Sequence, residues 1–167
     1  MLDEVMIALG MVVVGMLGLL SLLSSSIGIN KVVADQYVAS YLAAEGIEVF
    51  KNIVDNNVAS GVRAFNDSIG GEGVEYEIQY DTVQVNPSDE YDLGNPHFFR
   101  FGGVGGQPLR YNYQQGGQTP FIRHVSWSAL DAPAYNKLRV RSMVEWTSRG
   151  GAQYQIVLED YFYNWRQ

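Results

Sequence analysis

Two adjacent carboxylates, Asp3 and Glu4, stand directly before the longest uncharged stretch of the chain, which runs from Val5 to Asn30. A carboxylate near the centre of a bilayer costs about 2.5–3.5 kcal/mol. A group that is this costly to keep in an apolar environment usually has a partner of opposite charge. The residue types therefore predict charge pairing rather than bond-making chemistry, and Glu4 is the first candidate functional residue.

The element that must position Glu4 is a long apolar helix. At 1.5 Å per residue, residues 5–30 would span about 39 Å, which exceeds the roughly 30 Å of a hydrocarbon core. The stretch has no basic region before it and no small-residue cleavage site after it. We therefore interpret it as a retained membrane-spanning helix and not as a secretory signal.

Glycines recur within this apolar segment, at Gly10, Gly15, Gly18 and Gly28. Each lowers helix propensity by about 1 kcal/mol relative to alanine. Small residues also let helices approach closely in an apolar medium. One interpretation is a flexible membrane helix, and the more specific one is a helix that packs among copies of itself through Gly10, Gly15 and Gly18.

From Lys31 onward the pattern becomes amphipathic and predicts that the same helix continues to residues 55–57. An apolar stripe has the spacing of a helix that buries one side, and Gly46 interrupts it as either a packing notch or a weak point. The stripe consists of Val38, Leu42, Val49 and Ile53. A helix of about 80 Å is too long for the remaining chain to cover, so we expect its N-terminal half to lie in lipid or against other protein.

The rest of the chain predicts antiparallel β structure. Polar and apolar residues alternate with a period of two, as in strands with one wet face. The expected strands are 74–81, 109–113, 121–127, 138–146 and 154–158, with a hairpin turn at 148–151. Leu158, Tyr161, Phe162 and Trp165 have helical spacing, which predicts a docked turn or an irregular strand at the end of the chain.

These elements predict an α+β fold in which a long N-terminal helix packs on an antiparallel sheet of four to six strands. We expect three parts. They are an apolar helix half at 1–30, an amphipathic helix half at 31–56 and a globular β domain at 57–167.

Composition narrows the function classes. The chain from Lys31 onward holds all 11 Lys and Arg and 16 of the 18 Asp and Glu, so its net charge is 11 − 16 = −5. An acidic domain without a basic stripe is not expected to bind nucleic acid. The absence of cysteine excludes thiol catalysis and cysteine-ligated metals. No catalytic set is visible in the sequence, so we expect neither an enzyme nor a cofactor.

Three weaker signals remain in the β domain. Asp89 and Asp92 lie in an acidic loop that offers oxygen ligands for calcium, although a plain acidic surface loop is the commoner explanation. Asn66 begins the only N-x-S/T sequon, a candidate for glycosylation that chance also produces often. His97 and His124 lack an acidic or cysteine cluster nearby in the sequence, and we interpret both as ordinary strand or loop residues.

The segment Leu2–Gly10, LDEVMIALG, resembles the mature N-terminus of bacterial type IV pilins and type II secretion pseudopilins. That pattern is a few residues, a glutamate and then an uninterrupted apolar helix, and Glu4 falls on the glutamate. The resemblance extends through 43–49 and, more loosely, over 144–165. The chain departs from the pattern in having its glutamate at position four rather than five, in lacking a basic leader, and in carrying the additional carboxylate of Asp3.

The resemblance implies a type IV pilin-like fold and a processed, leader-less subunit. Such subunits are cut by a prepilin peptidase, wait in the inner membrane and are packed by an ATP-driven machine into an extracellular helical homopolymer. Met1 would then be the processed residue, often N-methylated in this family. Glu4, with Asp3 beside it, would pair with the α-amine of a neighbouring subunit and set the register of assembly.

The predicted function is therefore that of a pilin, a structural subunit of a type IV pilus-like filament that serves adhesion, twitching motility or DNA uptake. One alternative is a minor pilin or a pseudopilin of a pilus or a type II secretion system. Another is a membrane-anchored extracytoplasmic binding domain that never polymerises.

Overall fold

The computed structural model describes residues 1–61, 64–103, 108–148 and 150–164. The chain divides into two compact units, Met1–Tyr37 and Val38–Gln167. One helix, one 3₁₀ turn and seven strands are assigned in the described residues. In chain order they are α1 (Leu2–Ser60), β1 (Glu75–Tyr76), η1 (Pro87–Asp89), β2 (Arg100–Gly102), β3 (Arg110–Asn112), β4 (Gly117–Gln118), β5 (Phe121–Ala129), β6 (Lys137–Thr147) and β7 (Gln153–Tyr163).

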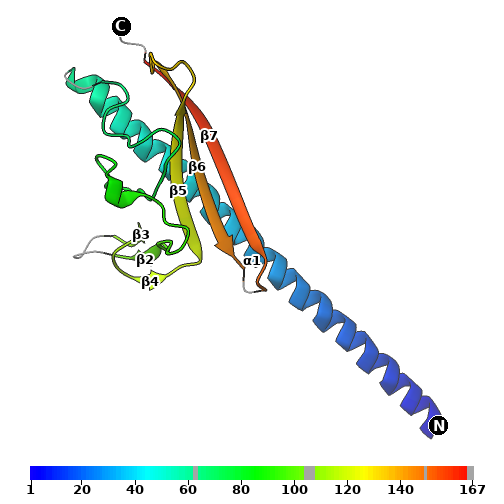
Figure 1. The fold of residues 1–167 in the computed structure, drawn as a ribbon. Helices are drawn as coiled ribbons and strands as arrows, with labels where there is room; N and C mark the ends of the chain where they lie inside the picture. The colour runs from blue at the N-terminus through cyan, green and yellow to red at the C-terminus, as the bar shows by residue number, and fades with distance from the viewer. Residues whose placement is uncertain (62–63, 104–107, 149, 165–167) are drawn as a thin grey trace. The chain divides into compact units, whose positions relative to one another are not determined.

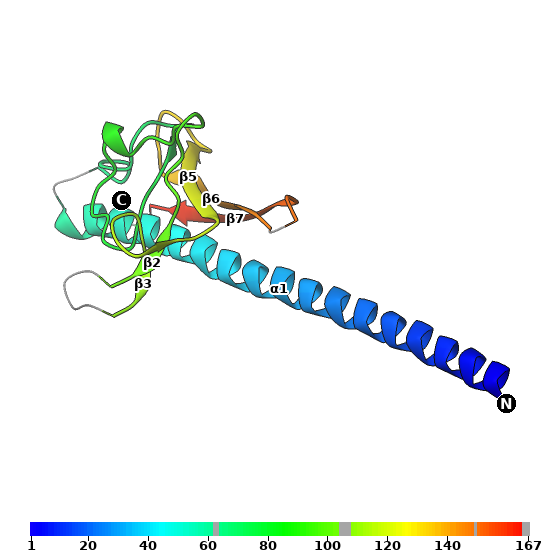
Figure 2. The same cartoon turned by 90° about the horizontal axis from the view of Figure 1, so that it is seen from below.

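The strands form two antiparallel sheets. The larger has the order β1-β5-β6-β7 and the smaller has the order β3-β2-β4. The C-terminal part of α1 lies along the larger sheet (Figures 1 and 2). The predicted α+β class, with a long N-terminal helix packed on antiparallel sheets, is confirmed.

The helix ends later than the sequence indicated. It continues to Ser60 instead of stopping within residues 55–57. Asn57 is only 1% exposed, and its side-chain amide donates to the carbonyl of Asp67, so this asparagine holds the last turn in place rather than ending it. Gly61, at a φ of +64°, takes the left-handed conformation that closes many helices.

The strand expected at residues 74–81 is formed only at Glu75–Tyr76. The alternation of burial persists, because Tyr76 and Ile78 both point into the core. The backbone then leaves the ladder with β5, and the amide of Glu77 donates instead to the carbonyl of Asp89 at 2.7 Å. Period-two alternation therefore predicted which side chains are buried, but not their strand pairing.

The end of the chain is a regular strand. β7 pairs with β6 along its whole length, from Thr147↔Gln153 to Lys137↔Tyr163. Regular pairing rather than helical spacing places Phe162 in the core, at 8% exposed. The hairpin turn is confirmed by hydrogen bonds around Ser148 and Gly151, whereas Arg149 and Trp165 lie outside the described residues.

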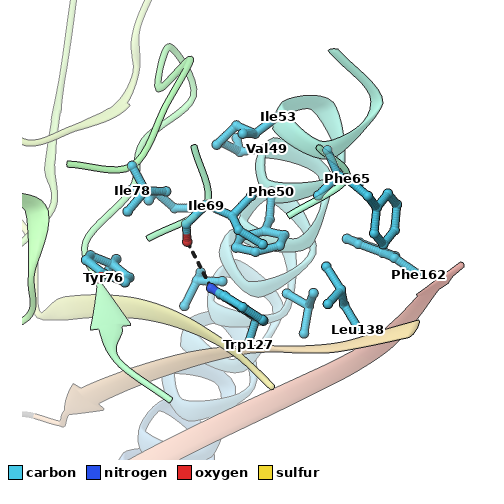
Figure 3. Packing of buried hydrophobic residues seen from close by; sticks show 14 residues of the cluster. Val49, Phe50, Ile53, Phe65, Ile69, Tyr76, Ile78, Trp127, Leu138 and Phe162 are labelled. Carbon is cyan, nitrogen blue, oxygen red and sulfur yellow. Dashed lines mark hydrogen bonds between the residues drawn. The ribbon is translucent and has the colours of Figure 1, made fainter. Parts of the chain in front are cut away.

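The core of the larger unit lies between α1 and the inner face of the β5-β6-β7 sheet. Figure 3 shows apolar side chains from the helix, the strands and the segment after the helix converging there. Phe50 and Ile53 of α1 and Leu138 of β6 are each 1% exposed or less. The indole of Trp127 donates to the carbonyl of Ile69 at 3.0 Å, which satisfies the polar end of a large buried ring.

Gly46 is a packing notch and not a weak point. A Cβ atom at this position would overlap Ser142 Oγ and would lie 3.1 Å from Cδ of Arg123 and from Cγ2 of Val125. Glycine therefore lets α1 approach the centre of the sheet closely. The hydroxyl of Ser142 is buried and has no hydrogen-bond partner in the part of the chain that the structure describes.

Arg123 is a fully buried cation at this point of closest approach. Its Nη1 donates to the carbonyl of Leu42 at 2.7 Å, and its Nη2 donates to the carbonyl of Ile78 at 2.6 Å. Glu45, one-third exposed, supplies the opposite charge at 3.4 Å. The guanidinium also lies 4.8 Å from the ring centre of Phe99. One side chain thus joins the helix, the sheet and two connecting segments.

We expect Gly46→Ala to destabilise the protein, because overpacking costs about 1–3 kcal/mol and outweighs the gain in helix propensity. Ser142→Ala alone should be neutral or stabilising, since it removes an unpaired buried hydroxyl. The double variant should recover part of the loss. Urea unfolding of the full chain in detergent, followed by tryptophan fluorescence, measures all three, and a double variant no more stable than Gly46→Ala would contradict the packing argument.

We expect Arg123→Met to lose about 3–5 kcal/mol, because two buried carbonyls lose their donor together with a buried charge pair. Arg141→Met is the matched control. Arg141 lies on the neighbouring strand, is largely exposed and pairs with Glu159 at 2.9 Å, so its loss should cost at most about 1 kcal/mol. The same urea titration compares the two, and equal losses would exclude a special role for Arg123.

Candidate functional site

The apolar part of α1 is the first candidate site. Every residue from Met1 to Asn30 is exposed. The helix contains a window long and apolar enough to cross a membrane, and none of that window is buried. Length and composition thus permit a membrane-spanning role, although the same test is passed by signal sequences. Within the described chain these side chains stay exposed.

Glu4 already has a positive neighbour within its own helix. Its Oε2 lies 3.5 Å from the α-amino nitrogen of Met1, and both groups are exposed. Asp3 and Glu4 occupy the first helical turn, where the unpaired amides of the helix N-terminus favour negative charge. The nearby amine and the helix N-terminus therefore stabilise the negative charges of Asp3 and Glu4. Both side chains stay exposed and can still contact another molecule.

The glycines of the apolar segment are open positions. A Cβ added at Gly10, Gly15, Gly18 or Gly28 would meet nothing within 4 Å. Nothing inside the described chain therefore requires glycine there, in contrast to Gly46. The close approach predicted for Gly10, Gly15 and Gly18 would have to come from another molecule.

The acidic loop predicted as a calcium candidate is organised by its own hydrogen bonds. Asp89 Oδ2 accepts from the amide of Asn86 at 2.8 Å in the capping of η1. Asp92 Oδ1 accepts from the amide of Gly94 at 2.8 Å. No group of three His, Cys, Asp or Glu side chains suited to a metal occurs among the described residues, and calcium binding stays a prediction.

Asn66 is half-buried in the turn that follows the helix. The residues around it are fixed by backbone contacts, including the amide of Asp67 donating to the carbonyl of Ala64 at 3.0 Å. Glycosylation at this sequon stays a prediction.

The two histidines lie beside glutamates that the sequence pattern did not connect to them. His97 pairs with Glu77 through its backbone amide and its ring nitrogen. His124 is 3% exposed, its Nε2 lies 3.9 Å from Oε1 of Glu75, and its ring makes a tilted contact with the ring of Tyr91, with 4.3 Å between ring centres. The His97–Glu77 pair and the Tyr91–His124 contact thus join the segment after η1 to the segment after β1 and to β5.

The outer face of the larger sheet is acidic around Tyr91. Burial raises the pKa of the Tyr91 hydroxyl, and the negative charges of Glu145 and Glu75, followed by those of Glu77 and Asp92, raise it further. The four carboxylates come from β1, β6 and the segments beside them. The surroundings of Tyr91 are therefore negatively charged, whereas Arg139 and Arg141 add positive charge farther along β6.

An open groove of about 570 Å³ lies beside this acidic region. Leu93, Phe98 and Ile122 give it apolar walls, and Glu145 and Gln155 add polar groups. Leu93 is 82% exposed. The indole nitrogen of Trp146, which also lines the groove, is buried without a hydrogen-bond partner in the described part of the chain.

Comparison of this chain with models of known protein families, with curated protein sequences and with solved structures found no match.

The sequence analysis identified the N-terminal carboxylates but missed both Arg123 and the groove. The signal for Arg123 was its place between apolar residues on the inward-facing side of β5, where an unpaired cation is costly. The groove had no comparable signal, because its walls come from four separate stretches of chain that only the tertiary fold brings together.

Proposed function

We propose that this chain is a pilin, the structural subunit of a type IV pilus-like extracellular filament. Before assembly α1 would hold it in the inner membrane, and after assembly the apolar parts of many α1 helices would form the core of a helical homopolymer. The subunit would act without enzymatic activity, and its filament would serve adhesion, twitching motility or DNA uptake. Its other partners would be the prepilin peptidase and the assembly machinery.

The observation that carries this proposal is the difference in burial between the two halves of α1. Between Ala39 and Asn57, α1 buries a continuous face in the β domain, whereas residues 5–30 carry no charge and are entirely exposed. A simple anchor needs about 20 apolar residues and no particular charge. The carboxylate at Glu4 and the open glycines are better explained by contacts with copies of the same helix.

Glu4 would act by exchanging partners. In a single subunit it lies 3.5 Å from the α-amine of Met1. In the filament core the same carboxylate would pair with the amine of a neighbouring subunit, with Asp3 adding negative charge beside it. A buried ion pair is stronger evidence for register than for net stability, so the pair would fix how far one subunit lies from the next.

The fold is compatible with a type IV pilin-like arrangement, which we propose as its finer description. A long N-terminal helix packs on a four-stranded antiparallel sheet. A minor pilin or pseudopilin would have the same architecture and would occur in trace amounts or at one end of a filament. An anchored binding domain would use α1 only to reach the membrane.

We expect Glu4→Gln to leave the β domain folded and to lower the yield of sheared filaments severely, because the neutral amide keeps the shape but removes the charge. Asp3→Asn should have a smaller effect. Glu48→Gln is the matched control, since Glu48 is exposed on the folded half of the same helix. Filaments sheared from the native cells and quantified by mass spectrometry give the yield, and normal yield from Glu4→Gln would refute the assembly role.

A second test separates a filament subunit from an anchored domain. Residues 2–26 are replaced by an unrelated spanning helix without acidic residues or glycines. A pilin should then stay in the membrane and disappear from sheared filaments, because the foreign helix anchors but does not pack. Retained function with the foreign helix would favour the anchored domain. Cryo-electron microscopy of wild-type filaments distinguishes a major from a minor subunit by whether this chain repeats along the whole length.

A further inference from the structure

The outer groove of the β domain has features of a docking site for another chain. Its walls are apolar at Leu93 and Phe98, its polar side is acidic at Glu145, and no basic residue lines it among the residues that the structure describes. Arg141, farther along β6, is already paired with Glu159. A fitting partner must therefore combine apolar side chains with positive charge.

The chain carries such a surface itself. We define the β2–β3 ribbon as the antiparallel pair Arg100–Gly102 and Arg110–Asn112 with the adjacent Leu109. Phe101 and Leu109 are 45% and 69% exposed, and the ribbon carries two arginines. No Asp or Glu occurs anywhere between Asp92 and Asp131, so the sequence around the ribbon carries no negatively charged side chain.

The arginines of the ribbon are held in place. The guanidinium of Arg110 lies 4.4 Å from the ring centre of Tyr80, and Arg100 donates to the carbonyl of Gly116 at 3.3 Å. Neither of them has a carboxylate partner among the ion pairs of the described residues. The ribbon thus presents positive charge beside exposed apolar groups, which is the complement of the groove.

We propose that the β2–β3 ribbon of one subunit docks into the outer groove of a second copy of this chain. Figure 1 shows β2 and β3 on one side of β5 and β7 on the other. A contact between two different surfaces of identical chains is heterologous, and such contacts produce rings or open helical polymers rather than closed dimers. The inference deepens the proposed function, on which it rests for the identity of the partner.

Two contacts would form in this interface. Leu109 and Phe101 would cover the apolar walls at Leu93 and Phe98. Glu145 would pair with an arginine of the ribbon.

The absence of cysteine makes disulfide cross-linking a direct test. The full chain carrying both Leu93→Cys and Leu109→Cys is expressed in the native cells, and membranes and sheared filaments are treated with a mild oxidant. We expect a ladder of covalent multimers from the double variant and none from either single variant. Leu93→Cys with Leu130→Cys is the matched control, because Leu130 is 50% exposed but lies outside both surfaces.

Charge-reversal variants test the electrostatic contribution to this contact. Glu145→Arg in the double-cysteine chain should lower the ladder about tenfold, and Arg100→Glu added to it should restore most of the loss. Lys137→Glu, an exposed change outside both surfaces, should leave the ladder unchanged.

The outcomes separate the two proposals. No ladder in any fraction, an equal ladder from the control pair, or dimers from a single variant would each overturn the docking inference. Filaments built from this chain but without a ladder would leave the pilin proposal standing and remove only this contact. A ladder in membranes from cells that make no filament of this chain would support the contact and refute the pilin proposal.

Discussion

A buried arginine is the constraint on which the β domain depends. Arg123 has no exposed surface, so protein groups must balance its charge, although its Nε has no hydrogen-bond partner in the described part of the chain. Its two shortest hydrogen bonds go to backbone carbonyls of α1 and of the segment after β1. These elements are far apart in sequence, and a cation that must reach both of them permits few relative positions of helix and sheet.

Other features of the domain follow from that requirement. The helix must come close enough for the carbonyl of Leu42 to meet the guanidinium, and Gly46, one turn later, provides the space. The carbonyl of Ile78 is used by Arg123, which accounts for part of the departure of this segment from the sheet after Tyr76. Phe99 lies against the same guanidinium and fixes the start of the smaller sheet. Burying a charge thus specifies an arrangement that apolar packing alone would leave less defined.

Features that repeat along the chain could be predicted from the sequence, whereas features made by single long-range contacts could not. The apolar run, the amphipathic stripe around Leu42 and Ile53, and the alternation in β5 and β6 each repeat many times, so tertiary context rarely reverses them. The last helical turn is held by the buried amide of Asn57, and the carbonyl of Ile78, just after the short β1, is bound by Arg123. The same difference applies to the candidate sites. Glu4 could be identified from the linear sequence, whereas the groove forms only when distant segments fold together.

The proposed assembly needs both charged contacts because apolar helices specify register poorly. Burial of apolar area is non-directional, so helices such as residues 5–30 could slide past one another at little cost. In the proposed filament, pairing of Glu4 with one amine would define the axial step, and glycines at Gly10, Gly15 and Gly18 would set how closely the helices approach. Neither device controls the rotation of the β domains about the filament axis. A directional contact between the basic β2–β3 ribbon and the acidic groove would fix that rotation. The N-terminal helices would then set the axial position of each subunit, and the contact between ribbon and groove would set the orientation of its β domain.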